Sequence, residues 1–64
     1  MRVLDIKNEY RNRRYVLKVE SDDKTDIIYI GRLKTDRFDN VKVQRFYVFD
    51  QHKIPTVSIY VQKV

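Results

Sequence analysis

The stretch from residue 41 to residue 50, VKVQRFYVFD, is the strongest β-strand signal in the chain. Its β-branched and aromatic residues suit a pleated, half-buried surface, and it contains neither proline nor glycine. Successive side chains of a strand point to opposite faces, so the odd positions share one apolar face. The even positions turn from polar to apolar halfway along: Lys42, Gln44, Phe46 and Val48. The pattern predicts a strand that is buried on one face at first and on both faces in its second half.

Arg45 interrupts this pattern, because its odd number places it on the apolar face with Val43 and Tyr47. A charged group is costly on a buried face. A β-bulge near Arg45 would shift the pleat and bend the strand. Such a bend is what a small barrel needs in order to curl over its core.

Four other segments alternate between apolar and polar residues, and we expect them to be strands: residues 2–6, 15–20, 27–34 and 57–61. The residues expected to point inward are Leu4 and Ile6 in the first, Tyr15, Leu17 and Val19 in the second, Ile28, Ile30 and Leu33 in the third, and Val57, Ile59 and Val61 in the last. A bulge at Gly31 would be needed to bring the three residues of the third strand onto one face. The segments between the strands are predicted to be loops.

Five short strands with short connections predict an all-β fold. We expect a five-stranded antiparallel meander that closes as a small, partly open barrel of the SH3-like or OB-like kind. The alternative is an open sheet completed by dimerisation. In that alternative a homodimer would cover a second apolar face, made of Val16, Tyr29, Phe46, Val48 and Tyr60. At 64 residues, the whole of 1–64 is expected to be one domain.

Charge and cysteine content narrow the range of partners and cofactors. Fourteen Lys or Arg residues against nine Asp or Glu give a net charge of +5, which favours acidic partners. There is no cysteine, so disulfides and thiolate zinc sites are excluded. No apolar run is long enough to cross a bilayer. We therefore expect a cytoplasmic protein with no membrane contact, no metal and no other cofactor.

Basic residues gather in two segments. The first basic segment, residues 7–18, contains Lys7, Arg11, Arg13, Arg14 and Lys18, with Tyr10 and Tyr15 between them. The second basic segment, residues 32–45, contains Arg32, Lys34, Arg37, Lys42 and Arg45, with Phe38. Guanidinium groups pair with phosphate in a planar fork, and aromatic rings stack on bases, so this combination is typical of a nucleic-acid surface. The plainer interpretation is a solvated loop that keeps a sheet edge soluble.

The predicted function is a small nucleic-acid-binding module for DNA or RNA. Its expected contact residues are Lys7, Tyr10, Arg11, Arg13, Arg14, Tyr15, Arg32, Lys34, Arg37 and Phe38. The alternative is a small protein-binding or inhibitor module of the kind that mobile genetic elements encode. It would act through an exposed strand edge, an aromatic face or the binding of an acidic protein surface. Tyr29, Phe46 and Tyr60 are expected to point outward, either as a stacking platform or as the closure of the barrel.

An enzyme is not expected. His52 is the only histidine and lies in a polar turn. The serines have no activating neighbour, and there is no glycine-rich phosphate loop. The acidic turn of Glu20, Asp22, Asp23 and Asp26 lacks the glycine and the terminal glutamate of a calcium loop, so it is interpreted as a turn.

Overall fold

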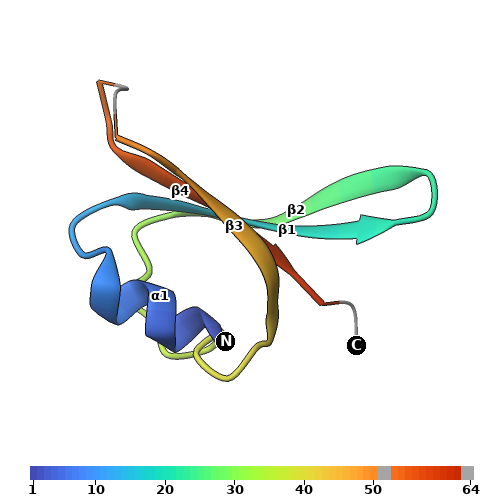
Figure 1. Ribbon diagram of the computed structural model, residues 1–64, viewed down its shortest axis with the longest axis horizontal. Coiled ribbons are helices and arrows are strands. Elements are labelled where there is room, and N and C mark those ends of the chain that lie inside the picture. Colours follow the sequence, from blue (N-terminus) through green and yellow to red (C-terminus); the bar gives the residue numbers. More distant parts are fainter. Residues whose placement is uncertain (51–52, 63–64) are drawn as a thin grey trace.

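The computed structural model describes residues 1–50 and 53–62. One helix, α1 (Val3–Glu9), precedes four strands: β1 (Arg14–Ser21), β2 (Lys24–Gly31), β3 (Val43–Phe49) and β4 (Thr56–Val61). The strands form one sheet in the order β2-β1-β4-β3 (Figure 1). Two antiparallel hairpins, β1–β2 and β3–β4, meet in the middle of the sheet, where β1 runs parallel to β4.

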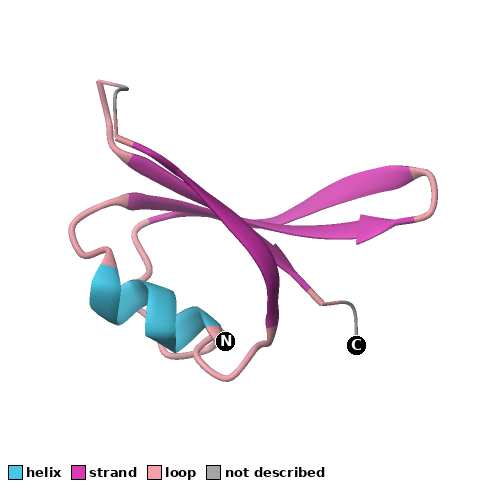
Figure 2. Ribbon diagram, viewed as in Figure 1, coloured by secondary structure: helices cyan, strands magenta, loops and turns pink. Residues whose placement is uncertain are grey.

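The prediction of a chain dominated by β-strands is confirmed, but the five-stranded meander and its barrel closure are not found in the described part of the chain. The sheet is open and four-stranded, with α1 against one face (Figure 2). The chain does not run from each strand to its neighbour, because residues 32–42 cross from one edge of the sheet to the other. We call the face that carries α1 the inner face and the opposite face the outer face.

The N-terminal segment was expected to be a strand with Leu4 and Ile6 inward, and this prediction is wrong. Val3 and Ile6 are buried, Tyr10 packs against the same core, and Leu4 is exposed. A spacing of three and then four residues places side chains on one face of a helix. The Arg2 N–H donates to Asp5 Oδ2 at 2.8 Å, which satisfies a free donor at the helix start.

The segment between β2 and β3 holds α1 against the inner face. The N–H groups of Val3 and Leu4 donate to the carbonyl oxygens of Val41 and Asp39, at 3.0 and 3.1 Å. These are donors that a helix start cannot satisfy by itself. Lys7 Nζ donates to Asp39 Oδ1 at 2.6 Å and to the Thr35 carbonyl oxygen at 3.0 Å. The helix and residues 32–42 therefore cover the core together.

The core lies between the sheet and this cover. Its buried members are Val3, Ile6, Tyr15, Leu17, Leu33, Val57, Ile59 and Val61. The inward faces predicted for β1 and β4 are confirmed. Both are central strands, and a single register shift in either would move all of their apolar side chains to the wrong face.

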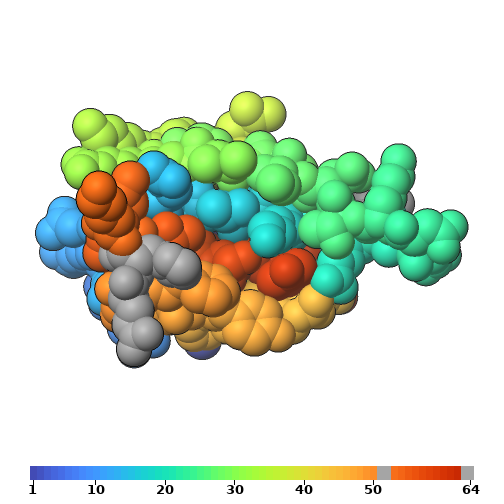
Figure 3. Space-filling model, turned by 90° about the horizontal axis from the view of Figure 1, so that it is seen from above, coloured from blue at the N-terminus to red at the C-terminus, as the bar shows by residue number. Residues whose placement is uncertain are grey.

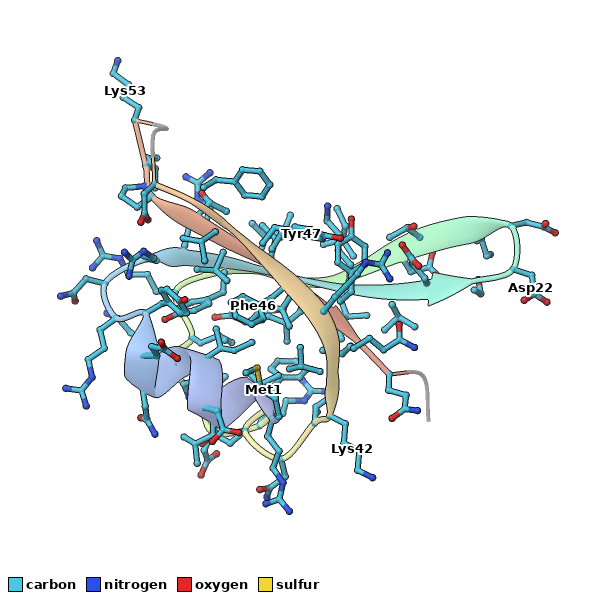
Figure 4. All side chains as sticks on the ribbon, viewed as in Figure 1. Met1, Asp22, Lys42, Phe46, Tyr47 and Lys53 are labelled. Carbon is cyan, nitrogen blue, oxygen red and sulfur yellow. The ribbon has the colours of Figure 1, made fainter. Side chains whose placement is uncertain are left out.

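The bulge predicted near Arg45 is also confirmed. The register of β3 against β4 shifts between Val43 and Arg45. Because the shift reverses the alternation, Phe46 and Val48 pack against the core. The expectation that the second half of this strand is buried on both faces is wrong, since Tyr47 and Phe49 are 48% and 42% exposed. Figure 4 shows Phe46 on the side of α1 and Tyr47 on the opposite side of the sheet.

The bulge predicted at Gly31 is wrong. The irregularity between β1 and β2 lies between Leu17 and Lys18, where Tyr29 pairs with Leu17 and Ile27 pairs with Lys18. Tyr29 therefore packs against the core, whereas Ile28 and Ile30 are exposed. Gly31 instead ends the strand with a φ of 137°, a conformation that side-chain-bearing residues rarely adopt.

Candidate functional site

The two basic segments meet at one end of the molecule, where two grooves adjoin. The first groove, of about 290 Å³, is lined by Lys7, Arg11, Asn12, Arg13, Tyr15, Arg32, Leu33 and Lys34. The second groove, of about 450 Å³, is lined by Asn12, Arg13, Arg14, Arg32, Lys53, Ile54 and Pro55. Asn12, Arg13 and Arg32 line both, so the two grooves adjoin.

Local backbone geometry brings the two basic segments together at this end of the molecule. Asn12, in the turn between α1 and β1, has a φ of 62°, and asparagine tolerates this left-handed conformation better than most residues. The Arg14 N–H donates to the Pro55 carbonyl oxygen at 2.9 Å, which joins the start of β1 to the β3–β4 connection. Gly31 turns the chain out of β2, and the Tyr29 hydroxyl donates to the Arg32 carbonyl oxygen at 2.5 Å.

The cations of the grooves differ in whether a carboxylate already neutralises them. Lys7 is paired with Asp39 at 2.6 Å, and both side chains are 18% exposed. Arg13 donates through Nε and Nη2 to the two carboxylate oxygens of Asp50, at 2.8 and 3.1 Å. Within residues 1–50 and 53–62, no carboxylate pairs with the remaining groove cations: Arg11, Arg14, Arg32, Lys34 and Lys53. These five are exposed and available to an anion.

The bidentate hydrogen bond from Arg13 lowers the pKa of the Asp50 carboxyl, and the charge of Arg13 acts in the same direction. The carboxylate therefore stays ionised under mildly acidic conditions. An anion that binds Arg13 would have to compete with Asp50 for its guanidinium group.

The aromatic residues expected to stack on bases have other contacts. The Tyr15 ring is 4% exposed, its hydroxyl donates to the Tyr10 carbonyl oxygen, and burial raises its pKa. The Tyr10 ring packs at 5.8 Å from that of Phe46, with the Arg13 guanidinium 5.2 Å from its centre. Phe38 packs at 5.5 Å from Tyr29.

Not every predicted cation reaches the grooves. Seven predicted contact residues line them: Lys7, Arg11, Arg13, Arg14, Tyr15, Arg32 and Lys34. Arg37 lies 5.5 Å from the Phe38 ring centre and is not among the lining residues. Lys53 and Asn12 were missed, because both lie in turns whose position depends on the tertiary fold. Lys53 lies in the β3–β4 connection, and only the pairing of β4 with β1 brings it beside Arg14.

Four of the nine acidic residues lie at the other end of the molecule. The β1–β2 hairpin carries Glu20, Asp22, Asp23 and Asp26. Figure 4 shows Asp22 at its tip and Lys53 at the opposite end of the longest axis, along which the Cα atoms extend 31 Å. This separation exceeds the screening length of about 8 Å at physiological ionic strength, so the hairpin hardly weakens the field at the grooves.

The expected platform of Tyr29, Phe46 and Tyr60 is not formed, since Tyr29 and Phe46 pack on the inner face. The outer face instead carries Tyr47 and Phe49 from β3 and Tyr60 from β4. The Tyr47 and Tyr60 rings meet edge to face at 5.9 Å, and Arg45 lies 4.2 Å from the Tyr60 ring centre. Arg45 also pairs with Glu20.

The described residues contain few other side chains that could bind a metal ion or act in catalysis. In the described part of the chain, no three His, Asp or Glu side chains gather as metal ligands. His52 lies outside the described residues. The buried Ser58 hydroxyl has no hydrogen-bond partner among the described residues. Within the same residues, no helix has the length and apolarity to span a bilayer.

Comparisons with protein-family models, curated proteins and solved structures gave no match to this chain.

Proposed function

We propose that the protein is a small nucleic-acid-binding module whose two grooves bind the phosphate backbone. The observation that carries this proposal is the set of five exposed groove cations with no carboxylate partner in the described residues: Arg11, Arg14, Arg32, Lys34 and Lys53. They come from three separate parts of the sequence and line two adjoining grooves.

Arginine predominates among these cations, which matters for the kind of anion bound. A guanidinium presents a planar fork of donors that matches phosphate oxygens, and it is always charged. Cations spread along a hollow suit a ligand with several phosphates. A single small anion would need one compact pocket.

The number of free cations gives a quantitative expectation. If all five neutralise phosphates, log affinity should fall against log salt with a slope of roughly −3.5 on single strands or −4.5 on duplex DNA. Affinity for a single strand would then drop on the order of a hundredfold between 50 and 200 mM salt.

The test is a fluorescence-anisotropy titration with mixed-sequence oligonucleotides over that salt range. The triple variant Arg11→Gln, Arg14→Gln, Arg32→Gln should lower the single-strand slope by roughly 2 units and weaken binding to all sequences alike. The matched control removes three cations that line neither groove: Arg2→Gln, Lys24→Gln and Lys42→Gln. Figure 4 shows Lys42 far from Lys53. Equal losses in both triple variants would mean that only net charge matters, and the groove proposal would fail.

A protein-binding or inhibitor module is the second candidate, and the β2 edge favours it. β2 lies at one side of the sheet, and its Ile27, Ile28 and Ile30 are 54%, 43% and 59% exposed. An open strand edge beside exposed isoleucines can accept an added strand from a partner. This candidate takes first place if the wild-type protein binds no oligonucleotide at low salt.

A further inference from the structure

Strand register arranges the outer face in rows that cross the sheet. Paired residues point to the same face, and the residues between the inward ones point outward. Arg14, Thr56 and Phe49 form the first row. Ile30, Val16, Ser58 and Tyr47 form the second row. Ile27, Lys18, Tyr60 and Arg45 form the third row. Figure 3 looks onto this face, and the four strands lie side by side with no helix over them.

The rows place aromatic rings between two groups of cations. Arg14, in the first row, also lines the second groove, so one groove cation stands in the same row as Phe49. In the third row, Lys18 and Arg45 flank Tyr60, at 5.3 and 4.2 Å from its ring centre. Tyr47 stands between these two cationic rows, 48% exposed. A path along β3 thus runs from groove cations over two rings to a second pair of cations.

The spacing along this path fits a chain of bases. Phe49 and Tyr47 are two residues apart on one strand, which separates them by roughly 6.7 Å. Bases in a stacked helix rise by roughly 3.4 Å, so the two rings match either every second base or neighbouring bases that are pulled apart. Rings of this kind stack on any base, because every base has a π-face.

A second copy of the chain fits this face less well. Packing two sheets face to face would bury Lys18, Arg45 and Arg14 of both copies, with Glu20 as the neighbouring carboxylate. Lys18 and Arg14 have no carboxylate partner in the described residues, and burying such unpaired cations costs more than the apolar contacts around them return. A bound polyanion, in contrast, would be attracted electrostatically by the same cations.

We propose that the outer face is a track for single-stranded nucleic acid, on which Tyr47 and Phe49 stack bases while the grooves and Lys18 hold phosphates. This inference rests on the proposed function and names the form of its ligand. A duplex keeps its bases stacked and presents them to the protein only by their edges, so the rings would add nothing to its binding. The track therefore predicts a preference for single strands.

The test compares two single strands of equal length, an oligothymidylate and an oligomer of abasic sugar phosphates, by fluorescence anisotropy at one salt concentration. Both carry the same phosphates, and only the first can stack. The wild-type protein should bind oligothymidylate tighter by roughly tenfold or more, because stacking contributes on the order of 1–3 kcal/mol per base. The double variant Tyr47→Leu, Phe49→Leu should lose most of that difference and keep its affinity for the abasic oligomer.

The control variant is Ile27→Val, which changes an exposed outer-face residue on the far edge strand and should bind both oligomers as the wild-type protein does. Circular dichroism of each variant verifies that the fold is kept, and leucine preserves the apolar bulk at both ring positions. Equal binding of the two oligomers by the wild-type protein would overturn the track and leave the grooves as the phosphate site. No binding of either oligomer would overturn the proposed function itself. A wild-type dimer in sedimentation that the double variant abolishes would assign the face to a second copy and also overturn the track.

Discussion

Replacing Ile59 with alanine should remove a large part of the stability of this domain. Ile59 lies on the central strand β4, is fully buried, and pairs with Leu17 on one side and Phe46 on the other. The change deletes three carbon atoms, worth about 2.4 kcal/mol at about 0.8 kcal/mol per carbon. The cavity left behind adds to this, so the expected loss is about 2–5 kcal/mol.

The same substitution at an exposed isoleucine is the matched control. Ile30 is 59% exposed. By the same rule, its replacement with alanine should cost about 1 kcal/mol. Folding free energies of about 0.05–0.15 kcal/mol per residue give a chain of this length about 3–10 kcal/mol in total. The Ile59 variant should therefore lose about a fifth or more of its stability, while the Ile30 variant stays folded.

Urea unfolding followed by circular dichroism measures both changes. With a slope of about 1 kcal/mol per molar urea, the Ile59→Ala midpoint should fall by at least about 2 M and the Ile30→Ala midpoint by about 1 M. If Ile59→Ala is unfolded in water, Ile59→Val should still show a loss of about 0.5–1.5 kcal/mol. Equal midpoints for Ile59→Ala and Ile30→Ala would refute the assignment of the inner and outer faces.

Three further changes test single features. Gly31→Ala should lower the urea midpoint by the equivalent of about 1–3 kcal/mol: its new Cβ would meet Tyr29 Oη only at 3.9 Å, so the φ of 137° carries the cost. Ser58→Ala should leave the midpoint unchanged or raise it, because it removes a buried hydroxyl with no partner in the described residues. Asp50→Asn should free Arg13 for phosphate and steepen the salt slope by about 0.7–0.9; Asp22→Asn, an equal charge change at the far hairpin tip, should not. Because the folded pKa of Asp50 lies below its unfolded value near 3.8, its ion pair stabilises the fold above that pH and is lost as pH falls further, which carboxyl NMR titration would follow.

The sequence predicts the central strands well and the edges of the structure poorly. In β1 and β4 the apolar residues alternate without interruption, and a neighbouring strand on each side enforces the register. β2 is an edge strand whose consecutive isoleucines, Ile27 and Ile28, fit either face. Only the shift of β2 against Leu17 and Lys18 decides which face each one takes.

The local sequence pattern alone could not show whether the N-terminal segment forms a helix or a strand. Leu4 and Ile6 fit a strand, and Val3, Ile6 and Tyr10 fit a helix. A helix as short as α1 is unstable by itself. Its first N–H groups bond to carbonyl oxygens of residues 39 and 41, so the helix forms because a distant segment completes it.

The meeting of the two basic segments is a consequence of topology. Their charge is visible in the sequence, but their adjacency depends on the β1–β2 hairpin, which pairs Tyr15 with Gly31, and on the crossing of residues 32–42 beneath the sheet. The parallel pairing of β1 with β4, which a meander lacks, adds Lys53 to the same grooves. Charge clustering therefore predicts the character of the site, and only the fold predicts its shape.

The position of the Tyr47 and Phe49 rings on the outer face is a consequence of the β3 bulge. An extra residue reverses the alternation for every later position of the strand. The same shift that removes Arg45 from the apolar face must therefore also exchange Phe46 and Val48 with Tyr47 and Phe49. The core gains a phenylalanine and a valine that pack beneath β4, and the outer face gains two rings in line with Arg45. A strand without the bulge would have buried Tyr47 with its hydroxyl and exposed Phe46, so one irregularity in one strand decides both which rings complete the core and which lie on the outer face.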